Sequence, residues 1–419
     1  MNINVQSLLR TKGLLLSTIQ SIGTGLSGQL LLLISGPIIA RLLGVEGRGY
    51  LAAINVWGLA LTAVGTMGIP AACAYYLNQE GRDQAKILGE TYRIAFAQIV
   101  VIVPILWAVL AWWARGKPAD VQVGAYLSLA FVPVNLLHQY ALGVIQGQRR
   151  FAALNVTRLL PALIYAAGAV GLFVVGVQRV QYVVSMWVGS FALSAIVSTL
   201  IALKGRNIIW LGNWSVRREL LIFGIRGYIG ILAPVDNLRL DQAAATFFLS
   251  AGSLGMYAVA GTFSNLPRFI AQSAGLVAYP SIARLKGEAS AEKLIWWYFL
   301  CISTINMGVV VILILTMPLL IPWLFGNEFS GAILIAQILL LGSALASSRK
   351  ILVECLRGNG YPGASTLAEL SMYPWLATGA LYLMLTNGAI GLAIGVALAY
   401  GLSLLVAIAV WRHQVKLRR

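Results

Sequence analysis

Residues 13–41 read GLLLSTIQSIGTGLSGQLLLLISGPIIAR and contain no charged side chain before Arg41. Because about 20 apolar residues suffice for a helix to cross a bilayer, this run predicts a first membrane-spanning helix. The run is too long for the apolar core of a signal peptide and does not end in a small-residue cleavage pattern. We therefore expect it to be retained as the first span.

The composition extends this prediction to the whole chain. Its 419 residues are 59% hydrophobic and only 10% charged, whereas soluble domains are about 45–50% apolar and about 25% charged. No alternating pattern typical of membrane strands recurs, so the spans are expected to be α-helices. The sequence predicts an all-α, multi-pass membrane protein with twelve spans, at residues 13–41, 50–77, 94–113, 121–145, 153–176, 181–203, 219–249, 253–284, 294–317, 329–349, 364–386 and 389–411.

The basic residues indicate an orientation. A net charge of +17 could point to nucleic acid, but the Lys and Arg residues cluster between apolar runs, which is typical of cytoplasmic loops. With the N-terminus inside, 22 of the 30 basic residues, Arg349 among them, fall on the inner side, five fall on the outer side and three lie within spans. We therefore expect both termini in the cytoplasm and no nucleic-acid partner.

A weak internal repeat suggests two halves. At an offset of 206 residues, Leu43 matches Leu249, Gly49 matches Gly255 and Ala52 matches Ala258. Six spans in each half give both halves the same orientation, as in parallel repeats about an axis along the membrane normal. The sequence predicts an N-lobe of spans 1–6 (residues 1–205) and a C-lobe of spans 7–12 (residues 206–419).

Catalytic signatures are missing from the sequence. The predicted outer loops are too short to hold catalytic acids and a sugar nucleotide, and neither GxxxxGK[ST] nor HExxH occurs. The chain has only two histidines, and its three cysteines lack metal-ligand spacing. We expect no enzymatic activity, no cofactor and no metal site.

Five stretches resemble one transporter family in order along the chain. They are IIARLLGVEGRGYLAA (38–53), VIQGQRRFAALN (144–155), LRLDQAAATFFLSAGSLGMYAVA (238–260), LIPWLFGNEFSGAILIAQILLLG (320–342) and LRGNGYPGAS (356–365). They are similar to the polysaccharide transporters, the O-antigen and exopolysaccharide flippases of the multidrug/oligosaccharidyl-lipid/polysaccharide exporter superfamily. The resemblance implies two six-helix lobes around a central cavity, a MATE-like fold and a bacterial inner-membrane location. It also implies an undecaprenyl-diphosphate-linked oligosaccharide as cargo, membrane lipid as a partner and polysaccharide polymerase machinery as a further partner.

Ionisable residues inside the predicted spans are the main candidates for function, because such groups are costly in hydrocarbon and normally face a cavity or a partner. They are Arg226, Asp236, Arg239 and Asp241 in span 7, Arg268 in span 8 and Glu369 in span 11. On an ideal helix Asp236 and Arg239 share a face and could form an ion pair, either structural or functional. The three acids are the candidates for ion coupling.

The three arginines are candidates for substrate binding. Arg268 has no acid nearby in sequence and suits bidentate capture of a diphosphate, although it could instead pair with Glu369 or another helix's carboxylate. Arg226 either lines the cavity or extends its side chain to the lipid head groups.

The first half differs from the second, because no carboxylate falls within spans 1–6 and Glu90 lies in a loop edge. Drug and cation exporters of the superfamily would place an acid there, so its absence favours an anionic cargo. Gln20, Gln29, Asn55 and His138 are candidates for binding sugar hydroxyls, or they form interhelical hydrogen bonds. His138 is either a structural group or a pH switch.

The sequence therefore favours a flippase for lipid-linked oligosaccharides that works by alternating access. A MATE-like exporter of small molecules or drugs is the alternative, and a scaffold protein or a membrane enzyme of unrecognised chemistry is a third class. Prolines and glycines of spans 1, 2, 7 and 8 would supply the bends for rocking of the two lobes.

Overall fold

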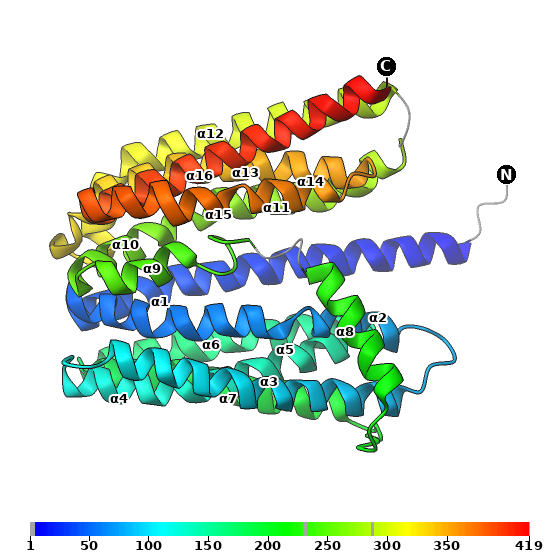
Figure 1. The fold of residues 1–419 in the computed structure, drawn as a ribbon, viewed down its shortest axis with the longest axis horizontal. Helices are drawn as coiled ribbons and strands as arrows, with labels where there is room; N and C mark the ends of the chain where they lie inside the picture. Colours follow the sequence, from blue (N-terminus) through cyan, green and yellow to red (C-terminus); the bar gives the residue numbers. More distant parts are fainter. Residues whose placement is uncertain (1–4, 229–232, 286–288, 419) are drawn as a thin grey trace. The chain divides into compact units, whose positions relative to one another are not determined.

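The computed structural model describes the backbone of residues 5–228, 233–285 and 289–418, and the side chains of residues 23–228, 233–285 and 290–414 (Figure 1). These residues form helices and connecting turns, and the described ranges contain no strand. The helices are α1 (Val5–Thr66), α2 (Ile69–Leu77), α3 (Gln84–Trp113), α4 (Ala119–Leu127), α5 (Phe131–Gly147), α6 (Phe151–Val175), α7 (Val180–Leu203), α8 (Trp214–Tyr228), α9 (Leu240–Phe248), α10 (Ala251–Phe263), α11 (Asn265–Ala283), α12 (Ala289–Phe325), α13 (Ala332–Gly358), α14 (Gly363–Leu370), α15 (Met372–Trp375) and α16 (Leu381–Arg418).

Eight helical stretches among the described residues are long and apolar enough to cross a membrane. Two of them combine two predicted spans each: residues 23–66 overlap spans 13–41 and 50–77, and residues 363–414 contain spans 364–386 and 389–411. The two parts of each stretch are joined by a single non-helical residue, Gly44 (φ 69°) or Gly388 (φ 59°). Positive φ is accessible to glycine at low cost, which explains why the turns occur there. The predicted spans 7 and 8 are divided into shorter helices, α8 with α9 and α10 with α11. The prediction of an all-helical membrane protein is confirmed.

The chain forms two compact units, residues 1–38 with 61–228 and residues 39–60 with 229–419. Helix α8 therefore packs with the first unit, beyond the boundary predicted at residue 205. Gly68, at φ 70°, allows this close contact, since a Cβ there would lie 2.5 Å from the carbonyl oxygen of Gly224 on α8. The rings of Tyr75 and Phe223 stack beside it, with their centroids 4.4 Å apart. The division of the membrane-embedded protein into lobes 1–205 and 206–419 stays a prediction.

Residues 39–60, the middle of α1, pack with the second unit through two glycines that the internal repeat had matched. A Cβ on Gly49 would lie 1.7 Å from the carbonyl oxygen of Ala251, and a Cβ on Gly255 would lie 2.1 Å from that of Val45. Only glycine permits backbones to approach this closely, as at other helix crossings in membranes. Arg41 makes a further contact between α1 and the second unit by donating from Nε to the carbonyl oxygen of Leu324 on α12, at 2.8 Å.

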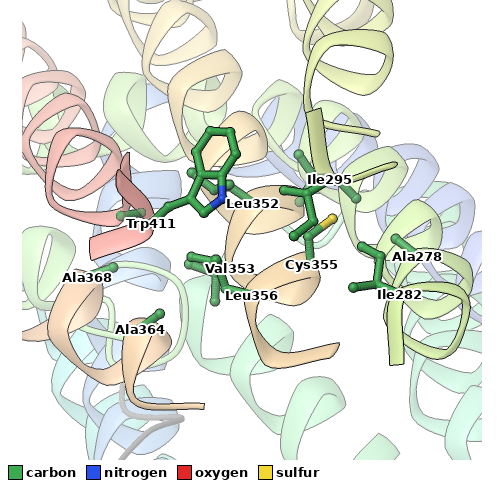
Figure 2. Close-up of a cluster of buried hydrophobic side chains, with 12 residues drawn as sticks. Ala278, Ile282, Ile295, Leu352, Val353, Cys355, Leu356, Ala364, Ala368 and Trp411 are labelled. Carbon is green, nitrogen blue, oxygen red and sulfur yellow. The ribbon is translucent and has the colours of Figure 1, made fainter. Parts of the chain in front are cut away.

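A core of buried side chains holds the helices of the second unit together (Figure 2). Ala278 and Ile282 of α11, Ile295 of α12, Leu352 and Cys355 of α13 and Trp411 of α16 are all less than 5% exposed. Ala364 and Ala368 of α14 complete the cluster. Helix α13 lies between the others and can therefore present a side chain at a fixed position in the middle of the unit. Arg349 is that side chain.

Candidate functional site

Asp236 is placed by a break in predicted span 7. Residues 234–237 form turns between α8 and α9, and Arg239 adopts the left-handed conformation (φ 49°) before α9 begins. Pro234 has no backbone N–H to donate, which favours an interruption of the helix here. The predicted pairing of Asp236 with Arg239 on one helix face is therefore wrong. Arg239 is exposed, and its Nη1 instead donates to Oε1 of Gln242, at 3.5 Å.

The Asp236 carboxylate accepts three hydrogen bonds from three other helices. Arg268 of α11 donates from Nη1 to Oδ1 at 3.0 Å, and Arg349 of α13 donates from Nη2 to Oδ2 at 3.2 Å. The hydroxyl of Tyr400 on α16 donates to Oδ1 at 2.6 Å. Both guanidinium groups also lie over the ring of Tyr400, with their carbons 5.3 Å (Arg268) and 5.8 Å (Arg349) from its centroid.

Arg349 connects this carboxylate to a second one, because its Nη1 lies 2.5 Å from Oε1 of Glu369 on α14. We call Asp236, Arg268, Arg349, Glu369 and Tyr400 the arginine cluster. It brings together five elements of the second unit, and its two positive and two negative side chains balance. Charge balance is what allows ions to be buried, since an uncompensated charge in a low-dielectric environment is strongly destabilising.

The two arginines of the cluster differ in exposure. The side chain of Arg349 is only 3% exposed and lies between two carboxylates, whereas that of Arg268 is 27% exposed and contacts one. Arg349 is thus a structural tie between helices. The side chain of Arg268 is partly exposed, while Asp236 and Tyr400 hold its orientation.

Arg349 is the member of the cluster that sequence reasoning misplaced. The sequence places Arg349 at the inner end of the span predicted at residues 329–349, but α13 continues to Gly358. Nine further residues of helix correspond to about 13 Å. The available signal was the apolar stretch Ile351–Val353, which directly follows the two basic residues.

Asp241 and Tyr257 form a separate buried pair in the same unit. Asp241 lies in the first turn of α9 and is 6% exposed, and the Tyr257 hydroxyl of α10 donates to its Oδ2 at 2.6 Å. Its other oxygen, Oδ1, is buried with no hydrogen-bond partner in the described part of the chain. Asn55 also belongs to this unit, and its Oδ1 is similarly buried without a hydrogen bond among the described residues.

The remaining candidates belong to the first unit and do not join the cluster. Arg226 is exposed on α8, and Gln29 is exposed on α1. The side chain of Gln20 lies outside the described residues. His138 is 3% exposed, and its Nδ1 lies 3.1 Å from the hydroxyl oxygen of Ser198. The imidazole of His138 is therefore buried and hydrogen-bonded within the first unit.

A carboxylate that the sequence places at a loop edge is buried in the first unit. Glu90 lies in the second turn of α3 with a side chain 1% exposed, and Arg217 of α8 donates from Nε to its Oε2 at 2.7 Å. The predicted span began at residue 94, whereas α3 begins ten residues earlier. Glu90 is therefore inside a helix but compensated by an arginine.

Known structures share this fold. The lipid II flippase MurJ in an inward closed conformation matches with a TM-score of 0.74 and 14% identity, over 94% of this chain and 87% of that one. A MOP superfamily transporter from Pyrococcus furiosus matches with a TM-score of 0.65 and 14% identity, over 96% and 95%. A multidrug resistance MATE family transporter in an outward-facing conformation matches with a TM-score of 0.66 and 15% identity, over 96% of this chain and 94% of that one.

The family is shown by the sequence itself. Residues 14–286 match the family described as "Polysaccharide biosynthesis protein", whereas no curated protein sequence matches the chain. The resemblance to this family and the MATE-like fold class are both confirmed. Since the match covers more than half of its length, the chain belongs to the polysaccharide biosynthesis protein family, with the fold of the MOP-superfamily transporters.

Proposed function

We propose that the protein is a flippase that moves an undecaprenyl-diphosphate-linked oligosaccharide from the cytoplasmic to the outer leaflet of a bacterial plasma membrane. It would supply O-antigen or exopolysaccharide synthesis, with the polysaccharide polymerase machinery as a downstream partner. The family supports a role in polysaccharide synthesis, and the MurJ flippase has the same fold. The protein would act as a transporter, not as an enzyme.

The observation that carries the proposal is that Arg268 is held in place by Asp236 and is still partly exposed. A diphosphate cannot cross a low-dielectric region without fixed positive groups to compensate its charge. Arg268 is oriented by Asp236 and Tyr400, and its side chain remains 27% exposed, although its Nε is buried without a hydrogen bond among the described residues. Its planar donor set matches phosphate oxygens. Arg239, which is exposed and donates a long hydrogen bond of 3.5 Å to Gln242, is the second binding group.

Other candidates are assigned supporting roles. Gln20, Gln29 and Asn55 would bind sugar hydroxyls, and Arg226 would contact the lipid head group near the membrane surface. The burial of His138 favours its structural role over a pH switch. Rocking of the two lobes would expose the site to each side in turn, with both termini in the cytoplasm.

Ion coupling would act through the acids. Asp236 and Glu369 are already compensated by arginines, so a change in their protonation would alter the charge balance around Arg268. Asp241, whose Oδ1 makes no hydrogen bond among the described residues, is the third coupling candidate. A cation bound to Asp236 would weaken the ion pair with Arg268 and free this arginine for the diphosphate, so cargo binding and ion binding would be coupled.

The test is flipping of a fluorescent undecaprenyl-diphosphate glycan in proteoliposomes. We expect Arg268→Ala to abolish flipping at normal protein abundance and Arg268→Lys to retain part of it, because lysine keeps the charge but not the planar fork. Arg357→Ala is the matched control, since this arginine is 45% exposed and pairs with Glu354 of its own helix.

Two outcomes would contradict the proposal. If Arg268→Ala lowers abundance and Asp236→Ala in the same protein restores both abundance and flipping, the arginine is purely structural. If the wild-type protein exports a cationic dye but does not flip the glycan lipid, it is a small-molecule exporter.

A further inference from the structure

Side-chain and backbone contacts hold the non-helical connection between α7 and α8 against the first unit. Ile208 and, at the start of α8, Val216 pack on a buried cluster that includes Cys73 of α2, Leu88 of α3 and Ile145 of α5. Asn213 ends the segment as the N-cap of α8, with Oδ1 accepting from the backbone N–H of Val216 at 3.1 Å. The inward side chains thus fix both ends of the stretch Ile209–Trp214.

Backbone contacts to α3 also hold this stretch near its two ends. The N–H of Ile209 donates to the carbonyl oxygen of Ala85 at 3.2 Å, and the N–H of Asn213 donates to Oε1 of the buried Glu90 at 2.7 Å. A Cβ on Gly89 would lie 1.9 Å from the carbonyl oxygen of Ile209, so only glycine permits this approach. Arg217 occupies the other oxygen of Glu90 and ties the first turn of α8 to the same carboxylate.

The same backbone directs three large apolar side chains outward. Trp210 is 57% exposed, Leu211 is 82% exposed and Trp214 is 69% exposed. The four charged residues between positions 204 and 218 are all basic: Lys204, Arg206, Arg217 and Arg218. Exposed apolar groups with a basic border are the features of a surface that contacts an anionic membrane.

We propose that Ile209–Trp214 is a lipid-binding surface that inserts into the head-group region of an anionic leaflet, with Glu90 holding it in the inserting conformation. Tryptophan is favoured at this depth because its ring is apolar and its N–H can donate to water or head groups. We call the Glu90 carboxylate, with its hydrogen bonds from the Asn213 N–H and from Arg217, the Glu90 clamp. Because this clamp already orders the segment, less conformational entropy is lost when the segment binds lipid. Since α8 and α3 share Glu90, insertion would also anchor the first unit to the membrane surface. The proposal does not depend on the identity of the cargo.

The experiment uses the full-length protein in vesicles of uniform lipid composition, so that its orientation does not matter. A fluorescent NBD group is attached at Leu211→Cys and, as the matched control, at Asn207→Cys, which is exposed in the same connection but not apolar. We expect NBD at position 211 to emit at shorter wavelength and to be quenched by spin labels near the lipid head groups. NBD at position 207 should behave as if in water.

A second set of measurements varies the charge of the vesicle lipid and removes the charge of Glu90. Each basic residue near an anionic surface favours binding by about fivefold, so Arg218→Gln should reduce quenching at position 211 in phosphatidylglycerol vesicles and not in phosphatidylcholine. A spin label at position 211 should become more mobile in Glu90→Gln. Glu219→Gln is the control, because that carboxylate is exposed and pairs with Arg82 outside the clamp.

Two results would overturn the proposal. In the first, NBD at position 211 is as accessible to aqueous quenchers as NBD at position 207, in both lipids. The exposed side chains would then not insert into lipid, and would contact a protein partner or nothing. The second is a spin label at position 211 that is equally mobile in the wild type and in Glu90→Gln; Glu90 would then not hold the segment in its inserting conformation.

Discussion

Replacing Asp236 by asparagine tests whether the arginine cluster is held together by charge. The substitution keeps the size of the side chain but removes the negative charge shared by Arg268 and Arg349. Its new amide N–H₂ group would also face a guanidinium donor. After the change, Arg349 still has Glu369 at 2.5 Å, whereas Arg268 has no other carboxylate within 4.0 Å among the described residues. The destabilisation should therefore come mainly from Arg268.

The magnitude follows from this uncompensated charge. Removing one partner of a buried ion pair costs about 3–5 kcal/mol, and because Asp236 is 28% exposed we expect the lower end, about 3 kcal/mol. The control is Asp241→Asn, which contacts the Tyr257 hydroxyl and no arginine within 4.0 Å in the described structure. Asparagine can still accept from Tyr257, so this variant should lose only about 1 kcal/mol.

The free energy of unfolding is measured by titration with SDS in mixed micelles, followed by circular dichroism. Adding Arg268→Met to Asp236→Asn should restore part of the lost stability, because it removes the uncompensated charge. Equal destabilisation by the two asparagine variants, or no recovery in the double variant, would refute the reasoning.

Further predictions concern packing, the buried histidine and the topology. Gly49→Ala should sharply lower the thermal stability, because its Cβ would lie 1.7 Å from a carbonyl oxygen. Gly36→Ala should be neutral, because its Cβ meets nothing within 4 Å, and thermal unfolding of both purified variants tests the difference. His138→Ala should cost about 1–3 kcal/mol of stability, because it removes a buried ring together with its hydrogen bond to Ser198, whose hydroxyl still donates to the carbonyl oxygen of Ala195. The pH profile of flipping should not change, and a shifted profile would indicate that His138 acts as a pH switch. Reporter fusions at Lys117 and Glu328 should both report the outer face, and a cytoplasmic signal from either would contradict the predicted orientation.

Much of the fold is predictable from the sequence because the apolar runs are long and the membrane requires helices. The limits appear at the ends of helices. The sequence places Arg349 at the end of a span, because charge normally marks such an end. The predicted start of the third span, residue 94, lies ten residues after the first residue of α3, because polar residues in the first turns of α3 hide its beginning. In both cases a partner on another helix compensates the charge.

The site was predictable as a set of residues but not as a set of contacts. Asp236, Arg268 and Glu369 were candidates because ions are rare within spans, and the structure places them in one cluster. Helical phase failed for Asp236 and Arg239, because the chain turns at Pro234 and again at Arg239. Pairing between Asp236 and Arg349, which lie 113 residues apart, depends on tertiary packing and leaves no local pattern.

The most direct test of the proposed function is the affinity of the purified protein for undecaprenyl diphosphate, with uncharged undecaprenol as the reference ligand. Hydrogen bonds to charged groups contribute about 1.5–3 kcal/mol each, so Arg268→Ala should weaken diphosphate binding by at least about tenfold and leave undecaprenol binding unchanged. Arg268→Lys should be intermediate. A folded Arg268→Ala protein that binds the diphosphate as tightly as the wild type would contradict the assignment of Arg268 as the anion-binding group.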